Sequence, residues 1–144
     1  MTTARSASSI LLIEDDDIAV YLTLKVIKSC GFTSEVDVVP NGNEAMAYLT
    51  CQGTYEGRQS GNPSLILLDL KLPDLSGFDV LKQIRTTPSL SSIPVFILSA
   101  SKTDEDIYRS NLLGISKYLI KPLDIEEFAP EAIKVMNSTK GAVH

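Results

Sequence analysis

The stretch LILLDLKLPDLSG, residues 65–77, combines a short apolar run with an acidic residue and a loop. Its first four residues are all apolar, which is typical of a short strand that is buried on both faces of a sheet. Asp69 follows that strand directly, and a helix is expected from about Phe78 to Arg85, after the loop. The stretch therefore predicts one strand–helix unit with a carboxylate at the carboxyl end of its strand.

The same alternation of a short apolar run and a longer amphipathic stretch occurs four more times along the chain. Strands are expected over residues 10–13, 35–39, 95–98 and 118–120, and helices over 16–30, 41–50, 104–111 and from 124 onward. Residues 51–63 hold three glycines and a proline and are expected to form a long loop. Five strand–helix units with right-handed crossovers predict an α/β fold, a doubly wound five-stranded parallel sheet with helices on both faces.

Apolar residues recur at helical spacing in two of the expected helices. In the first helix they are Ile18, Leu22 and Val26. In the last helix they are Ile125, Phe128, Ala129, Ala132, Ile133 and Met136. Pro130 interrupts this last stripe, so either a separate turn precedes the helix or the helix is kinked at that point.

Polar side chains follow four of the five apolar strands. Glu14 and Asp15 follow the first strand and Asp69 the third, while Ser99 and Lys121 follow the fourth and fifth. Because ligands of such sheets bind beyond the carboxyl ends of the strands, these groups are expected to meet in one site. Three carboxylates repel one another unless a cation joins them, and Mg²⁺ prefers oxygen ligands of this kind. The next acid, Asp16, is expected to cap the first helix rather than to bind metal.

Four segments in this order resemble the signature segments of the receiver domains of two-component response regulators. They are ILLIEDD (10–16), LILLDLKLPDLSG (65–77), PVFILSAS (94–101) and KYLIKP (117–122). The resemblance covers roughly residues 9–138 and implies the flavodoxin-like receiver fold. It leaves residues 1–8 and 139–144 as flexible tails.

The resemblance implies that Asp69 accepts a phosphoryl group from a histidine kinase or a histidine phosphotransfer protein. It also implies that Glu14 and Asp15 hold Mg²⁺ together with Asp69 and the backbone carbonyl of Lys71, and that Mn²⁺ can substitute. These assignments agree with general chemistry, since phosphoryl transfer depends chiefly on positioning and on charge neutralisation.

Four further roles are implied by the same resemblance. Ser99 would hydrogen-bond the phosphoryl group and Lys121 would pair with it, while the bond between Lys121 and Pro122 would be a cis peptide. Tyr118 stands at the aromatic position that moves with Ser99 on activation. The signal would then leave through the surface of the fourth helix, fifth strand and fifth helix, which would contact a partner or form a homodimer.

These features predict a stand-alone response regulator without enzymatic activity beyond its own phosphorylation and dephosphorylation. An intermediate that passes the phosphoryl group onward in a phosphorelay is left open. The loop at 51–63 is similar to that of small regulators paired with bacterial phytochromes, which makes a phytochrome-type sensor a candidate kinase.

Two enzyme classes fit the sequence less well. A phosphatase with an aspartate nucleophile, of the haloacid-dehalogenase type, needs a second acid where Lys71 stands. A dinucleotide-binding domain needs a G-x-G-x-x-G turn where this chain has EDDDIA, residues 14–19.

The composition narrows the partners and the location. The net charge of −5 and the pI of about 4.8 argue against a basic surface for nucleic acid or an anionic membrane. No apolar run approaches the ~20 residues that span a bilayer, and residues 1–9 lack the apolar core of a secretory signal. The length accommodates one domain with a sizeable core, and a cytoplasmic protein is expected.

Overall fold

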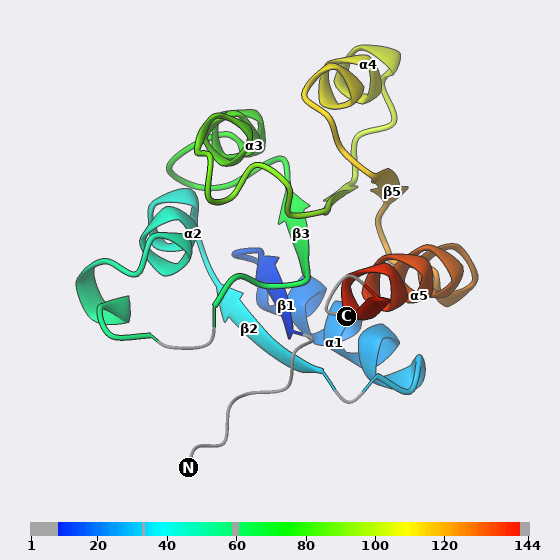
Figure 1. The fold of residues 1–144 in the computed structure, drawn as a ribbon. Coiled ribbons are helices and arrows are strands. Elements are labelled where there is room, and N and C mark those ends of the chain that lie inside the picture. The colour runs from blue at the N-terminus through cyan, green and yellow to red at the C-terminus, as the bar shows by residue number, and fades with distance from the viewer. Residues whose placement is uncertain (1–8, 33, 59–60, 142–144) are drawn as a thin grey trace.

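The computed structural model describes residues 9–32, 34–58 and 61–141 (Figure 1). The strands are β1 (Ser9–Ile13), β2 (Glu35–Val39), β3 (Leu65–Asp69), β4 (Val95–Ser99) and β5 (Lys117–Ile120). The α-helices are α1 (Asp17–Ser29), α2 (Gly42–Leu49), α3 (Gly77–Thr86), α4 (Asp104–Leu112) and α5 (Ile125–Gly141). A short 3₁₀ helix, η1 (Gly53–Tyr55), follows α2.

The five strands form one parallel sheet in the order β2–β1–β3–β4–β5. This is the flavodoxin-like order, in which the direction of winding reverses between β1 and β3. The prediction of a doubly wound α/β fold is confirmed. The carboxyl ends of β1 and β3, with the acids that follow them, therefore lie side by side at the switch point.

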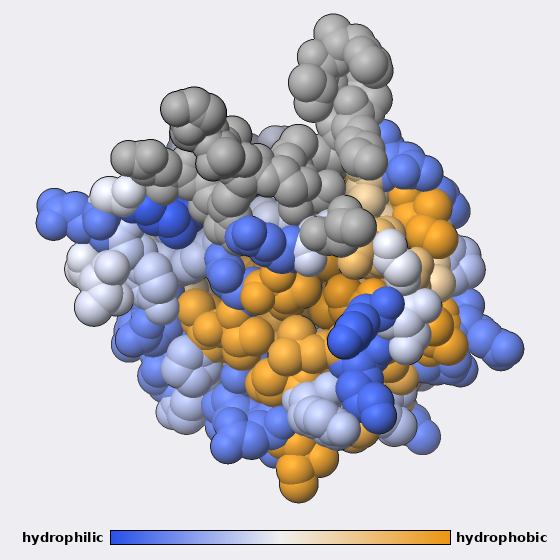
Figure 2. All heavy atoms as spheres, turned by 90° about the horizontal axis from the view of Figure 1, so that it is seen from below, coloured by the Kyte–Doolittle hydropathy of each residue, from blue (hydrophilic) through white to orange (hydrophobic). Residues whose placement is uncertain are grey.

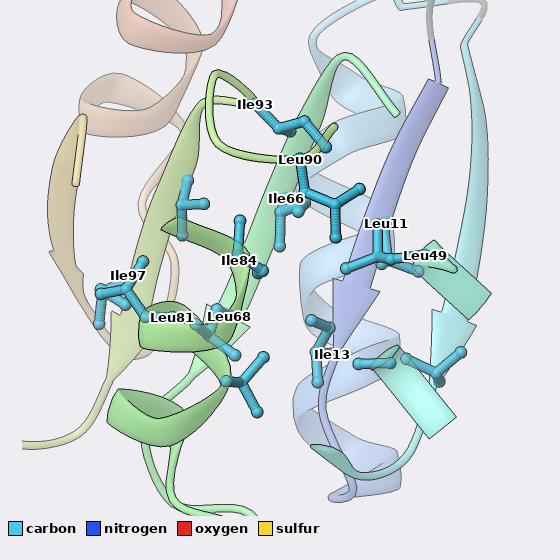
Figure 3. Packing of buried hydrophobic residues seen from close by; sticks show 14 of the residues in the cluster. Leu11, Ile13, Leu49, Ile66, Leu68, Leu81, Ile84, Leu90, Ile93 and Ile97 are labelled. Carbon is cyan, nitrogen blue, oxygen red and sulfur yellow. The ribbon is translucent and has the colours of Figure 1, made fainter. Parts of the chain in front are cut away.

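Successive residues of the central strands point to opposite faces of the sheet, and both faces are buried. One face packs against α2 and α3, and its strand residues are Leu11, Ile13, Ile66, Leu68, Val95 and Ile97 (Figure 3). The other packs against α1 and α5, and its strand residues are Ile10, Leu12, Leu65, Leu67, Phe96 and Leu98. Burial on both sides explains why these strands are apolar without alternation.

The apolar residues that recur at helical spacing in α1 are buried only in part, with Val26 packed against the core. Thr23 and Ile27 are buried, whereas Ile18 and Leu22 are 70% and 44% exposed. Apolar residues occur around most of this helix, so their spacing alone does not select the side that packs. Figure 2, which views the molecule from below Figure 1, shows apolar residues gathered in the middle of that face.

The predicted stripe of α5 is right only in part. Phe128, Ala132 and Met136 are buried at a spacing of four residues, whereas Ile125 and Ile133 are exposed. Pro130 lies inside the continuous helix, so no separate turn precedes it. The helix extends to Gly141, into the segment 139–144 that was expected to be a tail. Residues 1–8 and 142–144 lie outside the described residues.

The segment after α2, which was expected to be a long loop, makes several side-chain contacts with that helix. The Arg58 guanidinium lies 4.0 Å from the centre of the Tyr48 ring, and its Nε donates to the Tyr48 carbonyl at 2.9 Å. The Tyr55 hydroxyl donates to Glu44 Oε1 at 2.8 Å. Burial, followed by the contact with Glu44, raises the pKa of Tyr55 to about 12. These contacts attach the segment to α2.

Within the described part of the chain, no helix is both long enough and apolar enough to cross a bilayer.

Candidate functional site

The residues predicted from the sequence lie at the carboxyl edge of the sheet. Glu14 and Asp15 follow β1 directly, while Asp69 and Ser99 are the last residues of β3 and β4. Asp69 pairs with Leu98 in the register of the sheet, so Ser99 lies one residue farther along. Lys121 follows β5, and its backbone N–H donates to the Ser99 carbonyl at 2.8 Å. The edge thus carries acids, a hydroxyl and a lysine on neighbouring strands.

Three carboxylates form the acidic part of the site. One oxygen each of Glu14, Asp15 and Asp69 lie within 4.8 Å of one another. Glu14 and Asp69 are only 2% and 5% exposed, whereas Asp15 faces solvent. Buried like charges at this separation are unfavourable without a cation. A set of carboxylate oxygens suits a hard divalent cation such as Mg²⁺ or Mn²⁺.

Lys121 supplies a positive charge to this cluster. Its Nζ lies 2.6 Å from Glu14 Oε1 and 3.3 Å from Asp69 Oδ2. Burial raises the pKa of Glu14, with Lys121 opposing the rise and Asp69 adding to it. Burial on its own would lower the pKa of Lys121, but the two carboxylates outweigh it and raise that pKa. Lys121 therefore lies beside two buried carboxylates, and one positive charge does not neutralise the three acids of the cluster.

The backbone around Asp69 is held by close packing of the loop and α3. The Lys71 N–H donates to Asp69 Oδ1 at 3.1 Å, and the Gly77 N–H donates to the Leu70 carbonyl at 2.8 Å. A Cβ atom at Gly77 would lie 2.5 Å from the Asp69 carbonyl oxygen. Only glycine fits there without moving the backbone of the acid. Gly77 ends the segment LILLDLKLPDLSG, but its close approach to the backbone of Asp69 leaves no pattern along the sequence.

Ser99 is connected to α4 and β5 through Ser101. The Ser101 N–H donates to Ser99 Oγ at 3.0 Å, and the Tyr118 hydroxyl donates to the Ser101 carbonyl at 3.0 Å. The Ser101 hydroxyl donates to Asp106 Oδ2, in the first turn of α4, at 2.6 Å. The central position of Ser101 was not predicted, because three contacts of one small residue leave no sequence pattern.

Two smaller expectations can be placed in the structure. The Lys121–Pro122 peptide bond is cis, the conformation that the resemblance implies. Asp16 is the N-cap of α1, and its side chain accepts from the Ile18 N–H at 3.1 Å. The prediction that Asp16 caps the helix is confirmed.

The chain was compared with protein families and with solved structures. The model of the response regulator receiver domain matches residues 10–133. The chain belongs to this family. As a receiver domain it is a phosphoacceptor signalling protein of two-component systems, and the family implies a histidine kinase as its partner.

Similar receiver proteins include some that are named as phytochrome response regulators. Response regulator Rcp1 from Synechocystis sp. is 38% identical over 118 residues, which are 82% of this chain and 79% of that protein. The bacteriophytochrome response regulator RtBRR has a TM-score of 0.82 and 39% identity, covering 89% of this chain and 77% of that one. The phosphorylated cyanobacterial phytochrome response regulator RcpA has a TM-score of 0.75 and 34% identity, covering 95% and 91%.

A structure of Rcp1 also bears on the acidic cluster. It is described as the Mn²⁺-bound form, and it has a TM-score of 0.75 and 35% identity, with 90% of each chain covered. A similar receiver domain therefore binds a divalent cation. The family match also favours a receiver domain over the phosphatase and the dinucleotide-binding domain, which fit the sequence less well.

Proposed function

We propose that this receiver domain accepts a phosphoryl group on Asp69 from a histidine kinase, with Mg²⁺ bound. The observation that carries the proposal is the buried Asp69 carboxylate, which lies beside Lys121 and two further acids. The acidic net charge supports a protein partner rather than nucleic acid or membrane, and we place the reaction in the cytoplasm. A phosphorelay intermediate would use the same site for the same first step.

In the transfer step, an oxygen of the Asp69 carboxylate attacks the phosphorus of a phosphohistidine. The new oxygen–phosphorus bond forms as the nitrogen–phosphorus bond breaks, and the bonding electron pair stays on the imidazole nitrogen. Two contacts orient the carboxylate before attack: the Lys71 N–H on Oδ1 and Lys121 Nζ beside Oδ2. Positioning and charge neutralisation of this kind account for most of the catalysis of phosphoryl transfer.

The surrounding residues then stabilise the phosphoryl group. Glu14, Asp15 and Asp69, with the backbone carbonyl of Lys71, would hold Mg²⁺, and Mn²⁺ would substitute. When bound, the ion neutralises negative charge on the phosphoryl oxygens. Lys121 is placed to pair with another of those oxygens, and the Ser99 hydroxyl, at the end of the neighbouring strand, is placed to donate to one.

We assign the groove beside the site to the phosphate donor. A groove of about 210 Å³ lies between α1 and the residues after β5, lined by Ile18, Leu22, Lys121, Pro122 and Leu123 among others. It shares Lys121 with the acidic cluster, so a donor bound in this groove would lie beside the site. The occupant we propose is the histidine-bearing helix of a phytochrome-type kinase, because an exposed apolar stripe on α1 suits a helix with an apolar face.

The variant Leu22→Asp tests this surface. We expect it to slow phosphotransfer from the kinase by on the order of 10-fold, because it places a charge in an apolar contact. Transfer from acetyl phosphate should keep the wild-type rate, since that donor needs no docking surface. The matched control is Leu112→Asp on α4, where the leucine is 68% exposed. Equal loss of transfer from both donors, or no loss from the kinase, would contradict the assignment.

The signal is proposed to leave through α4, β5 and α5. When Ser99 turns toward the phosphoryl group, its hydrogen bond from the Ser101 N–H is weakened. Ser101 also accepts from the Tyr118 hydroxyl and donates to Asp106, so a displacement of Ser101 would weaken both contacts. Tyr118 is then free to move with Ser99, and α4 loses a contact in its first turn. A partner or a second copy of the chain would recognise the altered surface.

Amide hydrogen exchange with and without beryllofluoride, a phosphoryl mimic, tests this route. Exchange should change between residues 99 and 128, which contain α4, β5 and the start of α5. The second half of α2 serves as an internal reference that should stay the same. Changes confined to α1 and α2, with residues 99–128 unaltered, would refute the route.

A further inference from the structure

The first turn of α2 is capped by two side chains rather than one. Its own N-cap residue, Asn41, accepts from the Glu44 N–H at 2.8 Å. The amides of Gly42 and Asn43 instead donate to Oδ1 and Oδ2 of Asp74, at 2.8 and 2.9 Å. Asp74 lies 32 residues after Gly42 and 31 residues after Asn43. One carboxylate thus satisfies two helix amides that would otherwise lack an acceptor within the helix.

Asp74 belongs to the loop between β3 and α3, residues 70–76, which follows the phosphoacceptor. Its Oδ1 also accepts from the Leu75 N–H at 2.7 Å. Burial on its own would raise the pKa of Asp74, but the hydrogen bonds from Asn43, Gly42 and Leu75 outweigh it and lower that pKa. Asp74 is therefore a charged acceptor that fixes the loop to α2 near neutral pH.

The packing beside this contact is as close as the hydrogen bonds. A Cβ atom at Gly42 would lie 2.9 Å from Leu75 Cβ and 2.9 Å from Val80 Cγ2. Glycine at this position lets the start of α2 approach the loop and α3. The contact with Asp74 therefore fixes the middle of the loop. The hydrogen bond from the Gly77 N–H to the Leu70 carbonyl holds the two ends of the loop together.

Lys71 lies in this loop between Asp69 and Asp74. The Lys71 N–H donates to Asp69 Oδ1, and Asp74 follows three residues later. We propose that Asp74 is a positioning residue, which holds the loop against α2 and so presents the Lys71 carbonyl to the divalent cation. The inference rests on the proposed function, because the cation and its ligands belong to that proposal.

Direct binding of Mn²⁺, measured by electron paramagnetic resonance without any phosphodonor, tests the inference. Asp74→Ala removes both acceptors from α2, whereas Asp74→Asn keeps one carbonyl oxygen. Asn41→Ala is the matched control, because it removes a cap from the same helix turn without touching the loop. Circular dichroism confirms that each variant is folded, and Asp74→Asn provides the measurement if Asp74→Ala unfolds.

The expected result is a Kd for Mn²⁺ that rises by about 10-fold in Asp74→Ala and stays within about 2-fold in Asn41→Ala. Asp74→Asn should lie between them, and amide exchange at residues 70–76 should be faster in the two Asp74 variants alone. If the wild type binds Mn²⁺ and the Asp74 variants bind it as tightly as Asn41→Ala does, the role of Asp74 is overturned. The proposed function would survive that outcome. Absence of Mn²⁺ binding by the wild type would refute the metal role and the inference together.

Discussion

The Asp69→Asn variant is expected to incorporate no phosphoryl group from a kinase or from acetyl phosphate. An amide oxygen is a far weaker nucleophile than a carboxylate, and a phosphorylated amide would not be the acyl phosphate of the wild type. Removing one of three clustered negative charges should not unfold the chain, because it relieves repulsion between Asp69 and Glu14. Labelling with a radioactive phosphoryl donor, with circular dichroism to check folding, measures this.

The matched control for this variant is Asp79→Asn. Asp79 is an exposed acid in the first turn of α3, ten residues from the phosphoacceptor in the sequence. The same chemical change there should leave labelling at the wild-type level. Wild-type labelling of Asp69→Asn would show that another residue accepts the group.

Removing divalent cations is expected to abolish phosphorylation of the wild-type chain. Without the ion, Lys121 is the cation that contacts Glu14 and Asp69, and the incoming group adds further negative charge. The rate of labelling from acetyl phosphate should therefore fall below detection in excess chelator. Acetyl phosphate is used because a kinase needs Mg²⁺ for its own reaction with ATP.

Restoration with excess Mg²⁺ or Mn²⁺ is the control for this experiment. Both ions should return labelling to its original level, since both accept carboxylate oxygens as ligands. Undiminished labelling in chelator would contradict the metal role and leave Lys121 as the source of charge neutralisation. The Asp69 assignment would survive that outcome, because it rests on a separate variant.

The strands and the edge cluster could be predicted because each has a local signature. Buried parallel strands leave short continuous apolar runs, and the residue after each run must lie at the carboxyl edge of the sheet. Glu14, Asp69 and Lys121 were therefore identified from position alone. The contacts of Lys121 with both acids agree with that reasoning.

The packed face of α1 could not be predicted in the same way. The helix carries apolar residues on several sides, so Ile18 and Leu22 satisfied the helical spacing although they are exposed. Which side packs depends on where α5 and the sheet lie, and that is a tertiary property. The apolar residues left outside the core are the ones that we assign to the phosphate donor.

The supporting contacts of the site were also absent from the sequence prediction. Asp74 caps a helix that begins more than thirty residues earlier, and Gly77 matters because the backbone of Asp69 passes close to it. Neither contact creates a pattern along the chain, because both depend on segments that meet only in the folded protein. The sequence therefore predicted the groups that carry the chemistry better than those that hold them in place.

The most direct test of the central claim is to locate the phosphoryl group in the wild-type chain. Borohydride reduction of an aspartyl phosphate leaves homoserine at the modified position, which peptide mass spectrometry can assign after digestion. We predict homoserine at position 69 when phosphorylation is carried out with Mg²⁺, and unmodified Asp69 when a chelator is present. Modification at Glu14, Asp15 or any other residue, with Asp69 unmodified, would contradict the account.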